Sequence, residues 1–164
     1  MTGDGTLRWR DGAEDRLESI LGEAADRSTA SDDLASRIND WPTRYHLDRR
    51  RTNLLRPLHL GPGVRVLDAG AGTGVMSRYA AEAGATVVAV EGDARRAGLV
   101  ALRCEGTDVE VRCGAADEVD DPDGFDVVLA VGVLEYAAGR PGGAEVFLGR
   151  LARLVRPGGV LAVA

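Results

Sequence analysis

Short apolar runs separated by amphipathic segments fill the chain from residue 61 onward. Runs of this kind are typical of strands that are buried on both faces, as in a parallel sheet. Between them, apolar residues recur at helical spacing over about 74–83, 93–105 and 142–156. Strands that alternate with helices in this way predict a doubly wound α/β sheet. The predicted strands are 64–69, 86–92, 109–114, 125–132 and 159–164.

The residues before 61 follow a different pattern, which predicts a helical extension. An amphipathic helix is expected over 13–27, and Ser31 is placed to cap a second, short helix that ends at Asn39. Pro42 marks a turn, and a third helix is expected over about 47–56. The loop after the third predicted strand is too short and too acidic for a full helix.

These patterns divide the chain into an N-terminal arm with a helical extension (1–60) and a sheet-forming core (61–164). Of the 164 residues, 45% are hydrophobic but only 4% are aromatic, so the single core must be aliphatic. The net charge of −6 disfavours a nucleic-acid partner, and the basic cluster over 44–56 is interpreted as a solvated helix face. No apolar segment resembles a signal peptide or a membrane span, so we expect a cytoplasmic protein. No metal-ligand spacing surrounds Cys104 or Cys113, and no metal is expected.

The first predicted strand of the core ends in a glycine-rich turn with the sequence VLDAGAGTG. Gly70, Gly72 and Gly74 alternate with small residues, and glycine permits both positive φ and a close approach of a ligand to the backbone. The helix that follows would present free N–H groups and the positive end of its dipole. Ligands of open α/β sheets bind at the carboxyl ends of the strands, so the sequence predicts a nucleotide-type ligand here.

Spacing and charge argue against a dinucleotide at this turn. The dinucleotide fingerprint is G-x-G-x-x-G, whereas this turn reads G-x-G-x-G and is followed by Val75. Asp68 precedes the first glycine by two residues and would repel a pyrophosphate but attract a cationic ligand with an amino-acid end. Glu91, at the end of the next strand, is placed to accept hydrogen bonds from both hydroxyls of a ribose, a feature that both ligand classes share. An NAD-dependent oxidoreductase is therefore the less favoured alternative.

The turn VLDAGAGTG resembles motif I of the class I S-adenosylmethionine (SAM)-dependent methyltransferases. Three further stretches follow in the order of that family: VVAVEGD, FDVVLAVGVLEY and LARLVRPGGVLAVA. The resemblance covers about 60–164 and implies a Rossmann-like sheet of strand order 3-2-1-4-5, with SAM as the cofactor. It also implies that the family's final antiparallel strand pair is missing. The fifth strand would then be an open edge, to which a partner chain could bind.

The same resemblance assigns roles to individual residues. Asp68 orders the turn and the amino group of the ligand, and Glu91 holds the ribose. The acid that commonly follows the third strand is replaced by Ala115, so Asp117 becomes the candidate for the adenine contact. The cofactor-binding candidates are Asp68, Gly70, Gly72, Gly74, Glu91, Asp117 and Gly132.

The resemblance also implies where the methyl acceptor binds. Residues after the fourth strand face the acceptor in this family, and Glu135 is the candidate general base for a hydroxyl acceptor. The stretch YHLDRRRTNLLRPLHL is similar to a bacterial subgroup linked to glycosyltransferases and surface polysaccharide assembly. That similarity implies a small-molecule or glycan-type acceptor and a lid over the cofactor that includes Tyr45 and His46. The predicted function is SAM-dependent methyl transfer, and the alternative is a non-catalytic SAM-binding or partner-binding fragment.

Overall fold

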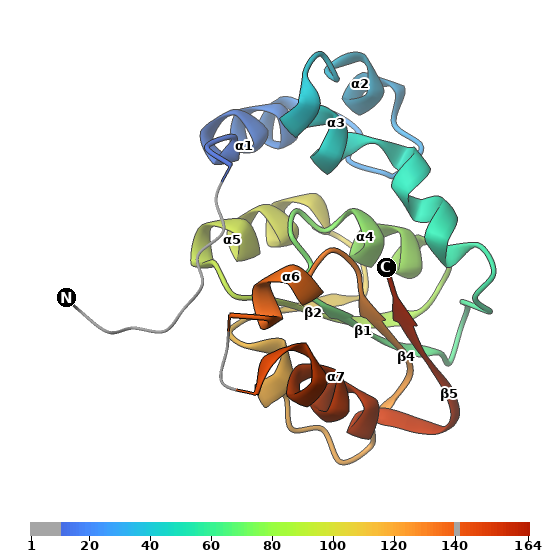
Figure 1. Ribbon diagram of the computed structural model, residues 1–164. Helices are drawn as coiled ribbons and strands as arrows, with labels where there is room; N and C mark the ends of the chain where they lie inside the picture. Colours follow the sequence, from blue (N-terminus) through green and yellow to red (C-terminus); the bar gives the residue numbers. More distant parts are fainter. Residues whose placement is uncertain (1–10, 140–141) are drawn as a thin grey trace.

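The computed structural model describes residues 11–139 and 142–164. Five parallel strands form one sheet in the order β3-β2-β1-β4-β5, with helices on both faces (Figure 1). The predicted α/β class and strand order are therefore confirmed. The strands are β1 (Arg65–Ala69), β2 (Thr86–Glu91), β3 (Val109–Cys113), β4 (Phe125–Ala130) and β5 (Val155–Val163).

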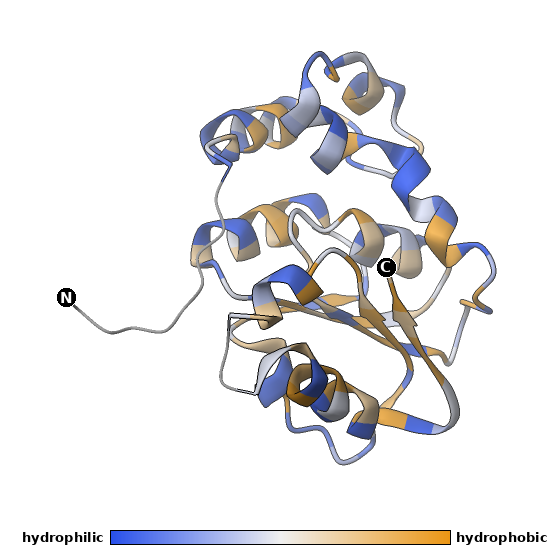
Figure 2. Ribbon diagram, viewed as in Figure 1, coloured by the Kyte–Doolittle hydropathy of each residue, from blue (hydrophilic) through white to orange (hydrophobic). Residues whose placement is uncertain are grey.

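The centre of the sheet is aliphatic, as the composition predicts. Leu67 of β1 pairs in register with Val88 of β2 and with Val128 of β4, and all three side chains are buried. Both faces of these strands are covered, which explains why their sequences read as continuous apolar runs rather than alternating ones. Figure 2 shows these strands as mainly hydrophobic, while the helices carry hydrophobic and hydrophilic residues side by side.

Helices cover the two faces of the sheet in separate pairs. Helices α4 (Val75–Glu82) and α5 (Ala94–Arg103) pack on one face, and α6 (Leu134–Ala137) and α7 (Gly143–Arg153) pack on the other. The loop between β3 and β4 holds only a short 3-10 helix, η2 (Ala116–Glu118), as its length and acidity predict. None of the helices in the described parts of the chain combines the length and apolarity that a membrane crossing requires.

The N-terminal extension forms a further layer over α5 (Figure 1). It consists of α1 (Glu14–Glu23), α2 (Asp32–Ser36), α3 (Trp41–Leu47) and the 3-10 helix η1 (Arg49–Leu55). The apolar faces of α1, α2 and α3 meet over Leu99 of α5. Through this packing, α3 reaches the carboxyl end of the sheet, where it forms one wall of the candidate site.

The predicted third helix over 47–56 is wrong in position and type. The α-helix begins at Trp41, because Asp40 and Thr43 form a reciprocal capping box and Pro42 lies in the first turn, where proline is well tolerated. The α-helix ends at Leu47, because the next residue, Asp48, has an extended backbone. Asp48 then caps the start of η1, the 3-10 helix that occupies most of the predicted range.

One strand boundary also differs from the sequence prediction, and one short helix was not predicted. Strand β5 begins at Val155 rather than at residue 159, because a register shift against β4 accommodates the Pro157 and Gly158 that were interpreted as a break. The short helix α6 was not predicted, since its four residues are too few to show helical periodicity.

Candidate functional site

A cavity of about 520 Å³ opens at the carboxyl ends of the central strands. Its walls come from the turn after β1 (70–73), the end of β2 (91–92), the loop after β3 (114–116) and the segment after β4 (131–133). Tyr45 of α3 closes a further side. This volume lies in the range of small-molecule and cofactor sites, and its position is the one that open α/β sheets use for ligands.

The backbone of the turn after β1 is fixed by the neighbouring strand. The N–H groups of Gly70 and Ala71 both donate to the carbonyl oxygen of Val90, at 2.9 and 3.0 Å. Gly70 has φ of +83°, and a Cβ added there would lie 2.2 Å from a methyl carbon of Val133. No larger residue fits between the turn and the segment after β4 without displacing Val133.

Gly74 has a different role from the two glycines before it. Gly70 and Gly72 line the cavity, whereas Gly74 is the N-cap of α4 and faces α5. A Cβ at Gly74 would lie 3.2 Å from Val100 and 3.3 Å from the sulfur of Cys104. This glycine therefore permits close packing of two helices and supports the turn from behind.

Asp68 lies beneath the turn and is fully buried. Burial raises the pKa of its carboxyl to about 6, and the negative charge of Glu91 acts in the same direction. A hydrogen bond from the hydroxyl of Ser77, at 2.5 Å, and the positive charge of Arg51 oppose this shift only in part. A cation placed in the cavity would favour the ionised form of Asp68.

Glu91 is held at the cavity by two backbone hydrogen bonds. One carboxylate oxygen accepts the N–H of Gly72 at 2.8 Å, and the other accepts the N–H of Asp93 at 3.0 Å. Each carboxylate oxygen can accept a second hydrogen bond, so Glu91 is both oriented and able to bind two hydroxyl groups.

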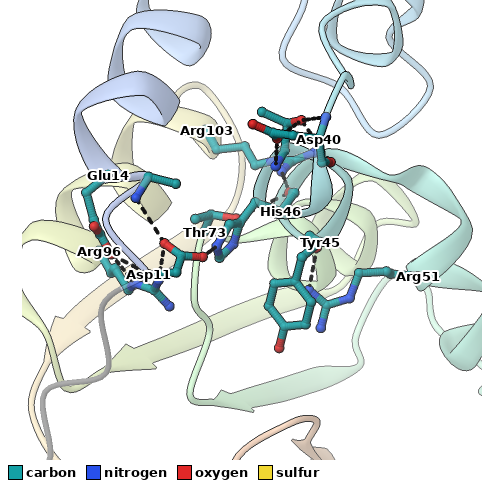
Figure 3. Close-up of polar contacts among 11 residues, drawn as sticks. Asp11, Glu14, Asp40, Tyr45, His46, Arg51, Thr73, Arg96 and Arg103 are labelled. Carbon is teal, nitrogen blue, oxygen red and sulfur yellow. Dashed lines mark hydrogen bonds and ion pairs between the residues drawn. The ribbon is translucent and has the colours of Figure 1, made fainter.

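Tyr45 and Arg51 line the same cavity as these carboxylates and lie side by side (Figure 3). The guanidinium carbon of Arg51 lies 4.0 Å from the centroid of the Tyr45 ring, and Arg51 also donates a 2.7 Å hydrogen bond to the Tyr45 carbonyl. Trp41 also stacks on the Tyr45 ring, with 5.2 Å between ring centroids. Within the described parts of the chain, no carboxylate forms an ion pair with Arg51, so its charge is available to an anionic group of a ligand.

Tyr45 spans the mouth of the cavity toward the segment after β4. A Cβ added to Gly132 would lie 3.0 Å from the Tyr45 hydroxyl oxygen. Tyr136 of α6 also lines the cavity. Two tyrosines, one from α3 and one from α6, thus line the cavity.

His46 follows Tyr45 in α3 and also lines the cavity, although its side chain is almost fully buried. Its Nε2 lies 2.9 Å from a carboxylate oxygen of Asp11, and its Nδ1 lies 3.4 Å from the hydroxyl of Thr73 in the glycine-rich turn. Burial lowers the pKa of this imidazole, although the hydrogen bond with Asp11 opposes that effect.

The structure brings most of the predicted cofactor residues to this one cavity. They are Asp68, Gly70, Gly72, Glu91 and Gly132.

Besides Gly74, two predicted residues do not line the cavity. The carboxylate of Asp117 lies 2.9 Å from a guanidinium nitrogen of Arg150 on α7, and the loop contributes Ala116 and Glu118 to the cavity wall instead. Glu135 is exposed on α6, beside the Tyr136 that does line the cavity. The adenine contact of Asp117 and the catalytic role of Glu135 stay predictions.

Several residues of the site were missed by the sequence analysis. Arg51 belongs to the basic cluster that was interpreted as a solvated face, and its neighbour Arg50 does lie in solvent. Arg96 and Thr73 line the cavity, and Asp11 contacts both Arg96 and His46. The sequence places Arg51 five residues after His46. Only the packing of the helical extension against the turn shows that both residues line the cavity.

The family model described as a methyltransferase domain matches residues 67–163, which is more than half of the chain. The chain therefore belongs to the methyltransferase-domain family, and the resemblance to the class I enzymes is confirmed.

Curated relatives agree with this family. The chain is 37% identical over 112 residues to a ubiquinone biosynthesis O-methyltransferase of Rhizobium leguminosarum bv. trifolii, a match that covers 66% of this chain and 42% of the relative. It is 35% identical over 109 residues to the protein of the same name from Agrobacterium fabrum, covering 65% and 41%. The chain thus spans about two fifths of the length of the curated relatives that it matches.

Solved structures show the same fold. A SAM-dependent methyltransferase from Geobacter sulfurreducens in complex with S-adenosyl-L-homocysteine superposes with a TM-score of 0.57 and 24% identity, over 90% of this chain and 54% of that one. The magnesium protoporphyrin IX methyltransferase of Synechocystis PCC 6803 with bound SAM gives a TM-score of 0.59 and 20% identity, over 88% and 67%.

Proposed function

We propose that this chain binds SAM in the 520 Å³ cavity and takes part in methyl transfer to a small-molecule acceptor. The observation that carries the proposal is the charge of the cavity. Two carboxylates, Asp68 and Glu91, border one glycine-rich turn, close enough for the charge of one to raise the pKa of the other. A pyrophosphate would place more negative charge beside them, whereas a ligand with an ammonium group, a cationic sulfonium and a ribose neutralises and hydrogen-bonds both.

The residues present fit the separate parts of SAM. Glu91 is oriented by two backbone hydrogen bonds and would accept the ribose hydroxyls. Asp68 would balance the ammonium group of the methionine part, through ordered water where the two do not touch. Arg51, which forms no carboxylate pair in the described residues, would bind the methionine carboxylate. The loop at 114–116 would face the adenine, with Asp117 as the proposed side-chain contact.

When bound, SAM supplies a methyl group already activated on sulfur. The chain has to align the acceptor with that methyl group and to keep water out of the cavity. Tyr45 and Tyr136 border the opening, and Gly132 leaves room between them and the end of β4. Glu135, which neighbours Tyr136 on α6, is the proposed base for a hydroxyl acceptor.

The class of acceptor is proposed from two observations. The relatives are named as O-methyltransferases of ubiquinone biosynthesis, which supports an oxygen on a small molecule as the methylated atom. The two tyrosines at the opening support an acceptor with an apolar face. A glycan-type acceptor fits the tyrosines equally, since sugar rings also stack on aromatic side chains, and an acceptor screen should include both classes.

A partner chain at the outer edge of β5 is also proposed. This strand is an edge of the sheet in the described residues, and Val160 and Val163 on it are 43% and 45% exposed. Exposed apolar strands at an edge bind further strands unless they are protected. Light scattering of the wild type and of a Val163→Lys variant would test this, since the proposal expects the wild type alone to exceed 17.2 kDa.

Calorimetric titration of the purified chain with SAM, S-adenosylhomocysteine and NAD tests the cofactor. We expect both sulfur compounds to bind and NAD to fail, with Glu91→Ala weakening binding by about 10- to 100-fold because two hydrogen bonds to a charged group are lost. A screen of hydroxylated acceptors with radiolabelled SAM then tests transfer. Binding of NAD in place of SAM, or a folded chain that binds neither, would overturn the proposal.

A further inference from the structure

We propose that Asp11, acting through His46, is a positioning residue that sets the shape of the SAM-binding turn. This inference rests on the proposed function. Three segments far apart in the sequence meet in the arrangement: Asp11 before α1, His46 in α3 and Thr73 in the turn after β1 (Figure 3). Among the described residues, Asp11 contacts His46 and Arg96 but none of the predicted cofactor residues, and it is through His46 that it reaches the glycine-rich turn.

The hydrogen bonds among Asp11, His46 and Thr73 all run in one direction, with Thr73 donating to His46 and His46 donating to Asp11. A carboxylate accepts hydrogen bonds only, so the 2.9 Å contact places the imidazole proton of His46 on Nε2. The other nitrogen, Nδ1, is then an acceptor for the Thr73 hydroxyl at 3.4 Å. The same hydroxyl lies 3.3 Å from the His46 carbonyl oxygen, so its single proton is shared between two acceptors of His46, both of which draw Thr73 toward α3.

Thr73 is the residue through which a side-chain hydrogen bond can hold this turn in place. In the turn sequence GAGTG it has the only polar side chain. The residues on either side are fixed by backbone contacts: Gly72 donates to Glu91, and the N–H of Gly74 donates to the Ala71 carbonyl. A shift of Thr73 would therefore move the N–H group that orients the ribose-binding carboxylate.

The surroundings of His46 keep it neutral and in place. The imidazole is 1% exposed, and burial lowers its pKa. Arg96 of α5 and Arg51 of η1 act in the same direction by their charge, whereas Asp11 acts against them. Arg103 of α5 donates a 2.8 Å hydrogen bond to the His46 carbonyl, which fixes the backbone.

Asp11 is itself held by more than the histidine. It accepts the N–H of Ala13 at 3.1 Å, and Arg96 lies 3.3 Å from its carboxylate. Burial acts to raise the pKa of Asp11, but the hydrogen bonds with His46 and Ala13 and the nearby positive charge lower it overall. The carboxylate is thus ionised at neutral pH and fixed in position, which a relay of this kind needs.

A merely structural role would be to hold α3 against α5. The two roles make different predictions, because Asp40 stabilises the same helix from its N-terminus without contacting Thr73. Asp40→Ala is therefore the matched control: it removes a carboxylate that anchors α3 but leaves the contacts among Asp11, His46 and Thr73 in place.

A double-mutant cycle in the full 164-residue chain tests the coupling, with S-adenosylhomocysteine as the titrated probe. We expect Asp11→Ala and Thr73→Val each to weaken binding by about 3- to 10-fold, the range for one net hydrogen bond. Because both act on one relay, the double variant should bind no more weakly than Thr73→Val alone. Asp11→Asn should fall between the wild type and Asp11→Ala, and Thr73→Ser should restore most of the affinity that Thr73→Val loses.

Asp40→Ala should lower the thermal midpoint yet change the affinity by less than about 2-fold, since a lost cap acts on stability. An affinity loss for Asp40→Ala equal to that for Asp11→Ala would overturn the proposal. Losses that multiply in the double variant would overturn it as well, with the proposed function intact. A folded wild-type chain that binds neither SAM nor S-adenosylhomocysteine would overturn the proposed function, and this inference with it.

Nitrogen NMR of the imidazoles tests the relay without any ligand. The chain has only two histidines, His46 and the exposed His59, so His59→Gln assigns both signals and His59 serves as the internal reference. We expect His46 to carry its proton on Nε2 and to have a pKa below the ordinary value for histidine. In Asp11→Ala its pKa should fall further, because a contact that raises it is lost. A proton on Nδ1 in the wild type would overturn the inference.

Discussion

The backbone N–H of Gly72 donates a 2.8 Å hydrogen bond to the carboxylate of Glu91, so the turn after β1 is tied to the end of β2. The same side chain that would accept the ribose hydroxyls thus also shapes the turn on which the methionine part would lie. Removing Glu91 has two consequences, and they can be measured separately.

We expect amide hydrogen exchange at Gly72 to be faster by about 5-fold in Glu91→Ala, because a hydrogen bond worth about 1 kcal/mol is lost. Glu91→Gln should keep exchange slow, since its amide oxygen still accepts the N–H. The amide of Gly70 is the internal control, because it lies in the same turn but donates to the carbonyl of Val90 in β2. Its exchange rate should not change. Equal acceleration at both amides would mean that the whole turn opens and that Glu91 has no local role.

The buried carboxyl of Asp68 makes the free protein less stable above neutral pH. Its pKa rises from 3.8 to about 6 on folding, chiefly through burial. The folded chain therefore holds the proton more tightly than the unfolded chain, and the stability that this contributes is present in full below about pH 4 and lost as the pH rises through 6. Asp68→Asn should raise the free energy of unfolding near pH 7.5 by about 1–3 kcal/mol and have little effect near pH 4.

The same change should abolish most of the SAM affinity, because the ammonium group loses its counter-charge. Urea unfolding at the two pH values, together with calorimetry, would measure both effects. In the wild type, binding near pH 6 should release a proton, since the bound cation favours ionised Asp68. Titrations in two buffers of different ionisation enthalpy would detect it. An Asp68→Asn variant that is less stable than the wild type near pH 7.5 would contradict this account.

The α/β class and the cavity position followed from local patterns, because buried parallel strands and a glycine turn have strong sequence signals. The strand order followed only from the resemblance to the class I methyltransferases. The first turn of α3 did not, since the capping box of Asp40 and Thr43 outweighs the usual meaning of Pro42 as a break. Boundaries of this kind depend on a few local hydrogen bonds that hydrophobic periodicity does not show.

Asp68 and Glu91 could be predicted as site residues because each lies at the carboxyl end of a strand. In a parallel sheet, all carboxyl ends lie at the same edge, where the ligand binds. Arg51, His46 and Asp11 were placed by contacts between segments that only the packing of the helical extension brings together. The partner of Asp117 is also distant in sequence: Arg150 reaches it from α7. Residues whose role depends on such tertiary contacts carry no local sequence signal.

Arg51 is expected to bind the carboxylate of the methionine part of the ligand. Arg51→Gln should weaken S-adenosylhomocysteine by about 10-fold or more, as a charge-assisted hydrogen bond is lost. It should leave 5′-methylthioadenosine, which lacks the amino-acid part, within about 2-fold of the wild type. Arg50→Gln is the matched control, because Arg50 is adjacent and equally charged but exposed and paired with Asp48. Competition binding of both ligands measures the difference, and an equal loss for both would place Arg51 elsewhere in the site.

Gly132 is expected to keep the space between the end of β4 and Tyr45 open. It has φ of +65°, and an added Cβ would lie 3.0 Å from the Tyr45 hydroxyl oxygen. Gly132→Ala should therefore lower stability by about 1–2 kcal/mol through the backbone and also weaken S-adenosylhomocysteine by displacing Tyr45. Adding Tyr45→Phe should recover much of the affinity but none of the backbone strain.

Gly158→Ala is the control for that experiment, because Gly158 has φ of +83° and open space around its Cβ position. It should lower the thermal midpoint by a similar amount, since the backbone strain is of the same kind, yet leave the affinity unchanged. Thermal unfolding and calorimetry on the variants separate strain from crowding. If Tyr45→Phe brought no recovery in the Gly132→Ala background, the contact between Tyr45 and the segment after β4 would not control access to the cavity.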